Sequence, residues 1–368
     1  MKKTLLATTA LAFVAAHASA VDVQMYGQVN KGLFGYDDGH DTNFVVIDNA
    51  LSTTRFGIKG AQVLDNGLTA SVLFEGEMAS NASDTFTQNS VTGSTGTSTT
   101  PGNTSPSFNE RQARVGLSGS FGGVYLGQQS TAIDGVLTQD LTGAQDVMSA
   151  DYGRIGGGLR LRNSNDTFAT AGTTTIGSLT DGIAQSRTDS LRYDSPILAG
   201  FQGRLSVAQG GDTEGAVFYD GAAGSFKLKG AAGVRFNNDN TTAGTNKVGQ
   251  EYVASASVAH TSGLGATVGY TRQELETKTA SADAPQSWYA KVGYAWDAFE
   301  VAADYGMNDN FSNAALNKDS LKAYGLGAQY NMGNGVSVAG LFRTYDANVT
   351  GTSGSDIDLY GVNMRVKF

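Results

Sequence analysis

The chain has 368 residues, with 49 glycines, 4 prolines, no cysteine and a formal net charge of −9. Disulfides and thiolate chemistry are therefore excluded, and the acidic balance supplies no basic stripe for nucleic-acid phosphates. Glycine is abundant together with Val, Thr, Tyr, Phe, Ser and Asn, which is typical of β-structure with many tight turns.

Residues 1–20 have the features of a secretory signal peptide. Two lysines precede a short apolar run, and an Ala-Ser-Ala cleavage sequence ends at Ala20. The run is too short to cross a bilayer comfortably as a helix, and no later segment is both long and apolar enough to do so. We therefore expect a single mature domain over 21–368, exported from the cytoplasm, whose net charge becomes −11 once the two lysines are removed.

Segments in which apolar and polar residues alternate recur along the mature chain, as expected for strands with one apolar and one polar face. In one of them, Trp288, Val292 and Trp296 alternate with Tyr289 and Lys291. The predicted strands are 23–36, 44–62, 67–79, 108–120, 122–130, 187–196, 199–210, 214–222, 224–237, 250–261, 264–275, 286–296, 298–307, 319–331, 335–346 and 355–368.

The connections between these segments alternate between short and long. Tight-turn sequences lie at 65–67, 120–123, 220–221, 262–263, 296–297 and 333–335. Long polar connections lie at 37–43, 80–107, 131–186, 238–249, 276–285, 308–318 and 347–354. Short turns on one rim and long loops on the other are the pattern of bacterial outer-membrane barrels. We therefore predict an all-β fold, a 16-stranded antiparallel transmembrane β-barrel whose first and last strands pair.

The last predicted strand alternates up to Phe368, whose ring would lie in the periplasmic aromatic girdle. A soluble β-sandwich array or a β-helix adhesin would also explain the glycines and the strands. Neither would explain the difference between the two rims or the terminal aromatic residue, so the barrel is the favoured interpretation.

Four segments carry a resemblance to a known family: LSTTRFGIKG (51–60), DNGLTASVLFEGEM (65–78), ERQARVGLSGSFGGVYLGQQ (110–129) and LRYDSPILAGF (191–201). Together with the terminal Phe368, they resemble the general diffusion porins of Gram-negative bacteria. The resemblance implies a homotrimer in the outer membrane, and a third long loop folded into the lumen. It also implies that Phe368 is the signal read by the assembly machinery.

The predicted loop 131–186 is far too long for an ordinary hairpin connection, and folding inward would narrow the channel. Four acids on this loop are candidates for the pore constriction: Asp134, Asp140, Asp146 and Asp151. Four bases are placed on the lumen side by the apolar neighbours in their strands: Arg55, Arg114, Arg192 and Arg204. In the family that this chain resembles, acids on the loop oppose bases on the wall, and the field between them screens solutes by size and charge.

This chain departs from the family pattern in three places. Gln28 and Gln128 stand where many relatives carry a base, and the loop lacks a family Pro-Glu-Phe-Gly-Gly stretch. The segment 163–186 has the character of an insertion that forms its own hairpin. Which acids reach the constriction is therefore open. With an acidic chain and a thinner basic cluster, we expect weak cation selectivity.

No catalytic, metal or cofactor site stands out in the mature chain. His40 lies in an acidic loop and His260 closes a strand, and neither is placed beside a serine nucleophile. The sequence GRIGGG (153–158) lacks the lysine and the strand-turn-helix context of a phosphate loop. The expected partners are other copies of the chain, outer-membrane lipid and lipopolysaccharide, and small hydrophilic solutes and ions.

Two functions remain open: passive diffusion of small solutes, or a barrel-scaffolded adhesin or surface receptor that acts through its loops. For the trimer, small outward residues such as Gly27 and Val29 would allow close subunit packing, and the loop 80–107 could latch over a neighbour.

Overall fold

The structure is a computed structural model that describes residues 22–88, 107–162, 168, 175–180, 187–238, 247–276, 283–311, 319–349 and 356–368. The hairpin expected within 163–186 lies largely outside these residues, as does most of the loop 80–107. No helix in the described ranges is long and apolar enough to cross a membrane.

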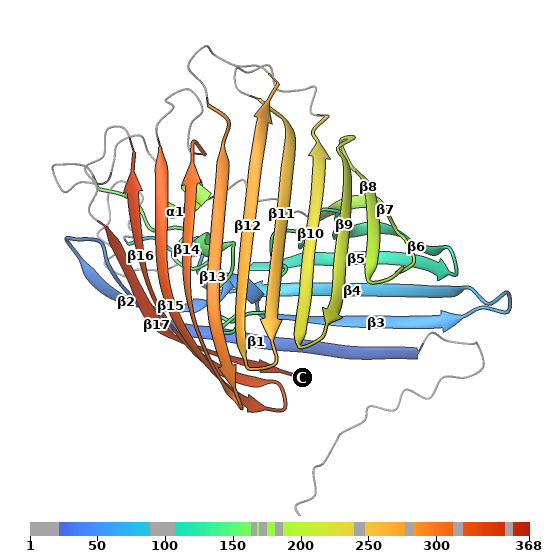
Figure 1. The fold of residues 1–368 in the computed structure, drawn as a ribbon, viewed down its shortest axis with the longest axis horizontal. Helices are drawn as coiled ribbons and strands as arrows, with labels where there is room; N and C mark the ends of the chain where they lie inside the picture. Colours follow the sequence, from blue (N-terminus) through green and yellow to red (C-terminus); the bar gives the residue numbers. More distant parts are fainter. Residues whose placement is uncertain are drawn as a thin grey trace, which may run out of the picture.

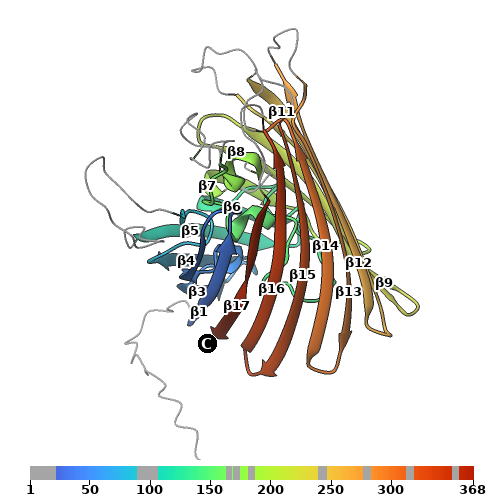
Figure 2. The ribbon, with the colours of Figure 1, turned by 90° about the vertical axis from the view of Figure 1, so that its left-hand side faces the viewer.

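The described residues form a strand-rich fold with three short helical segments (Figures 1 and 2). The strands are β1 (Asp22–Asp37), β2 (Thr42–Asp48), β3 (Arg55–Val63), β4 (Thr69–Ala79), β5 (Ser107–Gly119), β6 (Gly122–Ser130), β7 (Arg187–Asp194), β8 (Phe201–Ala208), β9 (Thr213–Ala223), β10 (Phe226–Phe236), β11 (Val248–His260), β12 (Leu264–Leu275), β13 (Gln286–Trp296), β14 (Phe299–Asp309), β15 (Ser320–Gly333), β16 (Val336–Asn348) and β17 (Ile357–Lys367). The helical segments are η1 (Ala50–Ser52), η2 (Tyr152–Arg154) and α1 (Ile176–Thr180).

The sheet closes on itself because β1 pairs with β17 along one edge, from Gln28–Lys367 to Asp37–Asp358. On its other edge β1 pairs with both β2 and β3, which are two halves of one interrupted barrel strand. Counting β2 and β3 as one, the described residues form a closed barrel of 16 antiparallel strands. The predicted fold class is confirmed, and the predicted segment 44–62 corresponds to this interrupted strand.

Most of the predicted strand boundaries are within two residues of those observed, with one error at a turn. Asp220 and Gly221 were predicted as a hairpin turn, but both lie inside β9. The chain reverses at Gly224 instead, where φ is +57°. Strand propensity and turn propensity overlap in this glycine- and alanine-rich stretch, so the sequence does not separate the two positions.

The two rims differ as predicted. Short turns join β3 to β4, β5 to β6, and then each later odd-numbered strand up to β15 to its successor. The other rim carries the long connections, except that β1 and β2 are joined there by only four residues, 38–41, and β8 and β9 by 209–212. On the short-turn rim, the backbone of Phe368 exchanges two hydrogen bonds of 3.0 Å with Gly27.

The outer face of the barrel is largely apolar, and the inner face carries polar side chains outside the hydrophobic cluster described next. Outward residues such as Val268, Trp288 and Val292 are about half exposed, whereas Thr267 and Lys291 between them point inward and are buried. This arrangement matches the predicted parity of the strands. Apolar side chains meet lipid and polar ones meet the lumen.

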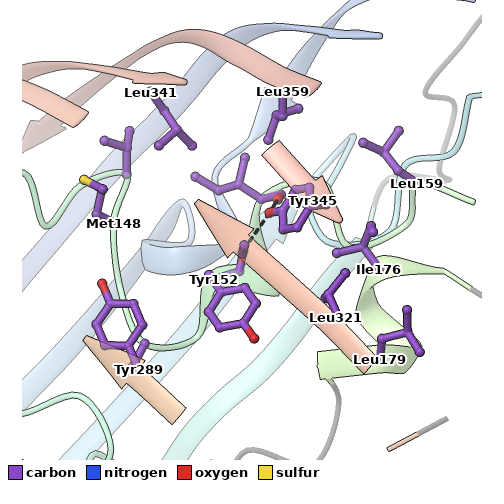
Figure 3. Close-up of a cluster of buried hydrophobic side chains, with 14 of the residues drawn as sticks. Met148, Tyr152, Leu159, Ile176, Leu179, Tyr289, Leu321, Leu341, Tyr345 and Leu359 are labelled. Atoms are coloured by element: carbon purple, nitrogen blue, oxygen red, sulfur yellow. Dashed lines mark hydrogen bonds between the residues drawn. The ribbon is translucent and has the colours of Figure 1, made fainter. Parts of the chain in front are cut away.

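A hydrophobic cluster fills part of the lumen, between the inner wall and the chain that follows β6. Figure 3 shows Met148, Tyr152 and Leu159 from this chain against Leu341 and Tyr345 of β16. Each of these side chains is at most 4% exposed. The cluster reaches from β9–β11 through β13–β17 to β1 and β2, whereas the wall that borders the remaining open space belongs to β3–β8.

Candidate functional site

The residues 131–162, called the inner loop below, run along the inside of the wall and are fixed to successive strands. Polar lumen side chains from one strand after another bind its backbone. They are Ser206 on β8, Glu214 on β9, Ser255 and Ser257 on β11, Glu300 on β14 and Gln329 on β15. Because side chains of successive strands bind these backbone groups, the path of the loop is set by the wall.

Asp140, one of the predicted loop acids, binds a cation on the wall behind the loop. Its carboxylate accepts a hydrogen bond of 2.9 Å from Lys291 Nζ on β13 and one of 2.8 Å from Thr267 Oγ1 on β12. The Lys291 side chain is completely buried. The charge of Asp140 is therefore largely compensated, although the residue borders open space on its other side.

Asp146 lies in a different place from the other three predicted acids. It forms an ion pair with Arg365 on β17 and accepts a hydrogen bond from Ser337 on β16, and it is 1% exposed. Its backbone carbonyl also accepts the Asn49 amide, at 2.8 Å. Asp146 is not one of the described residues that border the open lumen. These contacts attach the inner loop to the wall, so Asp146 acts as an anchor.

A third anchor involves Tyr152 and β16. The Tyr345 hydroxyl lies 2.9 Å from the carbonyl of Tyr152 and 2.6 Å from that of Ile155, and Figure 3 shows the hydroxyl directed at the loop backbone. Arg343 is fully buried beside them, where it is ion-paired with Asp304 of β14. Burial raises the pKa of the Tyr152 phenol well above its usual value, so the phenol remains neutral.

The interrupted strand provides a second inward projection. Between β2 and β3 the chain turns into the lumen, where the Gln28 amide nitrogen lies 2.8 Å from the carbonyls of Ser52 and Thr53. Asn30 binds the Ser52 carbonyl as well, at 2.7 Å. Gln28 was expected to thin the basic cluster. Here its neutral amide instead donates hydrogen bonds to backbone carbonyls of the inward turn. A basic side chain has a different shape and would not bind these carbonyls in the same way.

Gln128, the other glutamine expected in the lumen, shares the outward face. It pairs with Ala113 of β5, two residues from the exposed Val115. On its own strand, Gln128 lies two residues from Leu126, which faces outward and is 58% exposed. Gln128 therefore does not contribute to the lining of the lumen.

A cavity of about 700 Å³ remains between the inner loop, the inward turn of residues 49–54 and the wall. Its lining includes the four arginines expected at a constriction: Arg55, Arg114, Arg192 and Arg204. It also includes Asp134, Asp140 and Asp151 of the four expected acids. The structure thus brings seven of the eight residues around one space, with bases on the wall and acids on the loop.

Three further arginines line this cavity: Arg111, Arg154 and Arg187. Arg111 faces inward because a bulge opposite Glu75 and Gly76 shifts the register of β5. The alternation of side chains along β5 places Arg114 inward. Arg111 is three residues away, so without knowledge of the bulge the alternation predicts that it faces outward. Arg187 is the first residue of β7 and lies 3.7 Å from Asp134.

The carboxylates around the cavity form ion pairs with basic side chains. Arg111 is 2.6 Å from Glu77 and 2.8 Å from Glu75. Arg154, which follows Asp151 on the inner loop, bridges it to Asp84 at 2.7 and 3.0 Å. The Asp151 carboxylate raises the pKa of the Arg154 guanidinium above its ordinary value. These pairs fix the edge of the inner loop nearest the cavity.

Arg114 and Arg204 differ from the other cavity arginines, because neither forms an ion pair within the described part of the chain. The Arg114 guanidinium lies 4.4 Å from the ring centre of Tyr125, and its Nε and Nη1 are buried without a hydrogen-bond partner. Arg204 stacks at 4.0 Å on Phe218 and binds only the neutral Gln202 oxygen. Stacking fixes both guanidinium planes and leaves their charge uncompensated.

Arg192, another of the predicted bases, does have a carboxylate partner. It forms two parallel hydrogen bonds with Asp194, of 2.9 and 3.0 Å, and donates to the Ser130 carbonyl at 2.6 Å. Such a bidentate pair neutralises the guanidinium and holds it in one orientation.

These features define the class of protein: a transmembrane β-barrel with an open, charged lumen narrowed from inside. A family model described as Gram-negative porin matches residues 7–352. The chain belongs to the Gram-negative porin family, and its location is the bacterial outer membrane. The family resemblance inferred from the sequence motifs is thereby confirmed.

Individual relatives agree with this assignment. A monosaccharide porin from a Halomonas species is 25% identical over 358 residues, which are 94% of this chain and 80% of that protein. An anion-selective porin from Comamonas acidovorans has a TM-score of 0.61 at 17% identity, with 95% of this chain and all of that chain covered. OmpT of Vibrio cholerae in its trimer form has a TM-score of 0.57 at 14% identity, with 95% and 100% covered. At these identities the two structures are similar in fold.

Proposed function

We propose that this porin is a passive channel through which small hydrophilic solutes and ions diffuse across the outer membrane. The observation that supports it is the cavity of about 700 Å³, which is lined by charged side chains between the inner loop and the wall. A lumen of this kind remains hydrated, and its charged groups act on a solute as it passes.

Seven of the eight residues expected at the constriction keep this role in the proposal. The four arginines, Asp134, Asp140 and Asp151 border the passage. Asp146 holds the inner loop in place from behind, since its carboxylate is buried against Arg365.

The charge preference of the passage depends on which charged side chains in its lining lack an ion-pair partner. In the described lining, seven arginines face six carboxylates, and every one of these carboxylates has an ion-pair partner. Arg114 and Arg204 have none. Weak cation selectivity was expected from the net charge of the whole chain, whereas the uncompensated charge at the passage is positive. We therefore propose a weak preference for anions.

Single-channel recording in planar lipid bilayers tests the channel itself. The purified protein should produce stepwise currents that scale with KCl concentration and do not require a specific solute. The alternative, an adhesin or receptor that uses the barrel only as a scaffold, predicts that the lumen carries no current. Absence of conductance from correctly folded barrels would contradict the channel proposal.

We also propose that the protein assembles as a homotrimer surrounded by outer-membrane lipid and lipopolysaccharide. The trimer form of the Vibrio cholerae protein of similar fold supports this assembly. The expected role of Phe368 in assembly stays a prediction. The residue is 71% exposed, and its ring lies against Gly27 at the short-turn rim.

A further inference from the structure

The connection that follows β4 begins inside the barrel. We call its described residues, 80–88, the β4 segment. Ser83 of this segment donates its backbone N–H to the carbonyl of Asp48 at 2.9 Å, at the point where β2 ends. The Phe86 side chain is completely buried and packs against Tyr36 on the inner side of β1, with 6.2 Å between the ring centres. The connection as a whole was expected to reach over a neighbouring copy, whereas this part of it lies within its own lumen.

Ser83 joins the β4 segment to the two other parts of the chain that project inward. Its side-chain oxygen accepts a hydrogen bond of 2.9 Å from the backbone N–H of Ala50, in the inward turn, and donates one to the carbonyl of Arg154 on the inner loop. Its own carbonyl accepts the N–H of Gly156 at 2.8 Å. Ser83 is completely buried, so loss of these bonds would leave polar groups without water to replace them. One serine therefore connects three segments that lie beside the passage.

The glycine run of the sequence GRIGGG gives room for this contact. A Cβ on Gly157 would lie 2.9 Å from a carbonyl oxygen of the β4 segment, and one on Gly158 would lie 2.2 Å from the carbonyl oxygen of Phe86. Beyond the glycines, the side-chain amide of Gln88 binds both the carbonyl and the N–H of Arg160, at 2.6 and 2.8 Å. The glycine run, which lacks the context of a phosphate loop, therefore allows two backbone segments to pack closely.

This contact places one base at the edge of the passage. In the described lining of the cavity, Arg154 is the base that the inner loop contributes, and Ala82 and Asp84 of the β4 segment belong to the same lining. The Arg154 guanidinium lies 3.0 Å from Asp84 and 2.7 Å from Asp151 of its own loop. Its backbone carbonyl is bound by Ser83. The β4 segment therefore fixes both the main chain and the side chain of Arg154.

We propose that the β4 segment is a second constriction element, in which Ser83 and Asp84 are positioning residues for Arg154 and thereby determine the charge selectivity of the passage. While Arg154 lies between Asp84 and Asp151, both carboxylates are compensated. Release of the contact would leave Arg154 with Asp151, which is nearer and on the same loop, and would leave Asp84 at the passage without a base. The inference rests on the proposed channel function and adds a selectivity-determining element to it.

Ser83→Ala tests this role because it removes the connecting hydroxyl and changes no charge. We expect the reversal potential in a KCl gradient to shift towards cations, since Asp84 is then uncompensated. Ser190→Ala on β7 is the matched control. Ser190 is also buried, its hydroxyl has no hydrogen-bond partner within the described residues, and it does not line the cavity, so this variant should keep the wild-type potential. An unchanged potential in Ser83→Ala would overturn the inference.

The same substitution in an Arg154→Gln background separates positioning from a general loosening of the lumen. Asp84 has already lost its base in Arg154→Gln, so Ser83→Ala should add little further shift there. A hydrogen bond with only a structural role would produce the same shift whether or not Arg154 is present. Equal shifts in the two backgrounds would therefore contradict the positioning role.

A cysteine at Ala82 tests whether the β4 segment borders the passage, since the chain contains no native cysteine. A water-soluble maleimide that carries a polyethylene glycol chain should lower the single-channel conductance of Ala82→Cys, with labelling verified by mass. Thr85→Cys is the control, because Thr85 is exposed and is not among the residues that line the cavity. Its conductance should not change.

Conductance that the attached chain leaves unchanged at Ala82, or lowers equally at both positions, would refute the second constriction element. The unlabelled variants still conduct in that case, so the channel proposal would stand. Absence of current from the folded, unlabelled protein would instead contradict the channel itself.

Discussion

At the scale of single residues, Arg114 and Arg204 are the cavity arginines without a carboxylate partner in the described part of the chain. Replacing either by glutamine removes a positive charge that no neighbouring acid neutralises. We predict that Arg114→Gln and Arg204→Gln both shift the reversal potential in a KCl gradient towards cations.

Arg272→Gln is the control for this prediction. Arg272 lies 2.7 Å from Glu274 on β12, does not line the cavity and has a side chain that is 42% exposed. Its removal should change the reversal potential little, since solvent and salt screen exposed charges. An equal shift in all three variants would mean that the charge preference arises from the protein as a whole rather than from the passage.

Asp146 is a residue whose effect should appear in stability before it appears in selectivity. Asp146→Asn leaves Arg365 near the wall without its partner, and removal of one member of a buried ion pair costs about 3–5 kcal/mol. We predict a clear fall in the urea midpoint for unfolding, followed by the fluorescence of Trp288 and Trp296. Asp220→Asn, which breaks an exposed pair with Lys229, should change this midpoint much less. Equal midpoints for the two variants would contradict the assigned anchor.

At the scale of elements, the inner loop depends on the strands behind it. The Tyr345 hydroxyl on β16 serves two loop carbonyls, and unsatisfied buried acceptors cost about 1–3 kcal/mol each. We predict that Tyr345→Phe loosens the loop, so that the open-channel current becomes noisier while the barrel remains folded. Tyr324→Phe, on the outward face of β15, should leave the current noise unchanged. Identical noise in both variants would argue that the hydrophobic cluster alone holds the loop.

At the scale of the whole molecule, the selectivity of the passage depends on salt. The net charge of the chain is negative, whereas the uncompensated groups at the passage are positive, so near and distant charges oppose each other. The Debye length is about 8 Å at physiological ionic strength and about 30 Å at 0.01 M.

We therefore predict that the anion preference is clearest near physiological salt and weakens as KCl is diluted, because the distant acids then act on the lumen as well. Reversal potentials measured at one concentration ratio over a series of KCl concentrations check this. An anion preference that grows steadily on dilution would mean that the positive passage dominates the field at every range.

The sequence by itself determined the barrel, because the alternation of side chains along a strand is local. A period of two fixes which residues face lipid and which face the lumen, whatever the rest of the chain does. Arg55, Arg114, Arg192 and Arg204 could be placed on the inner wall for this reason. Short turns and long loops are local as well, which is why the two rims could be told apart.

Only the tertiary structure decided what each lumen group does. Asp146 and Asp151 look alike in the sequence, but one is buried against Arg365 and the other borders the cavity. Arg111 turns inward through a bulge whose partner strand is more than thirty residues away. Gln28 binds a backbone turn that parity cannot reveal. The reason is physical: charge compensation and burial depend on contacts between distant segments, whereas the period of a strand depends only on its neighbours.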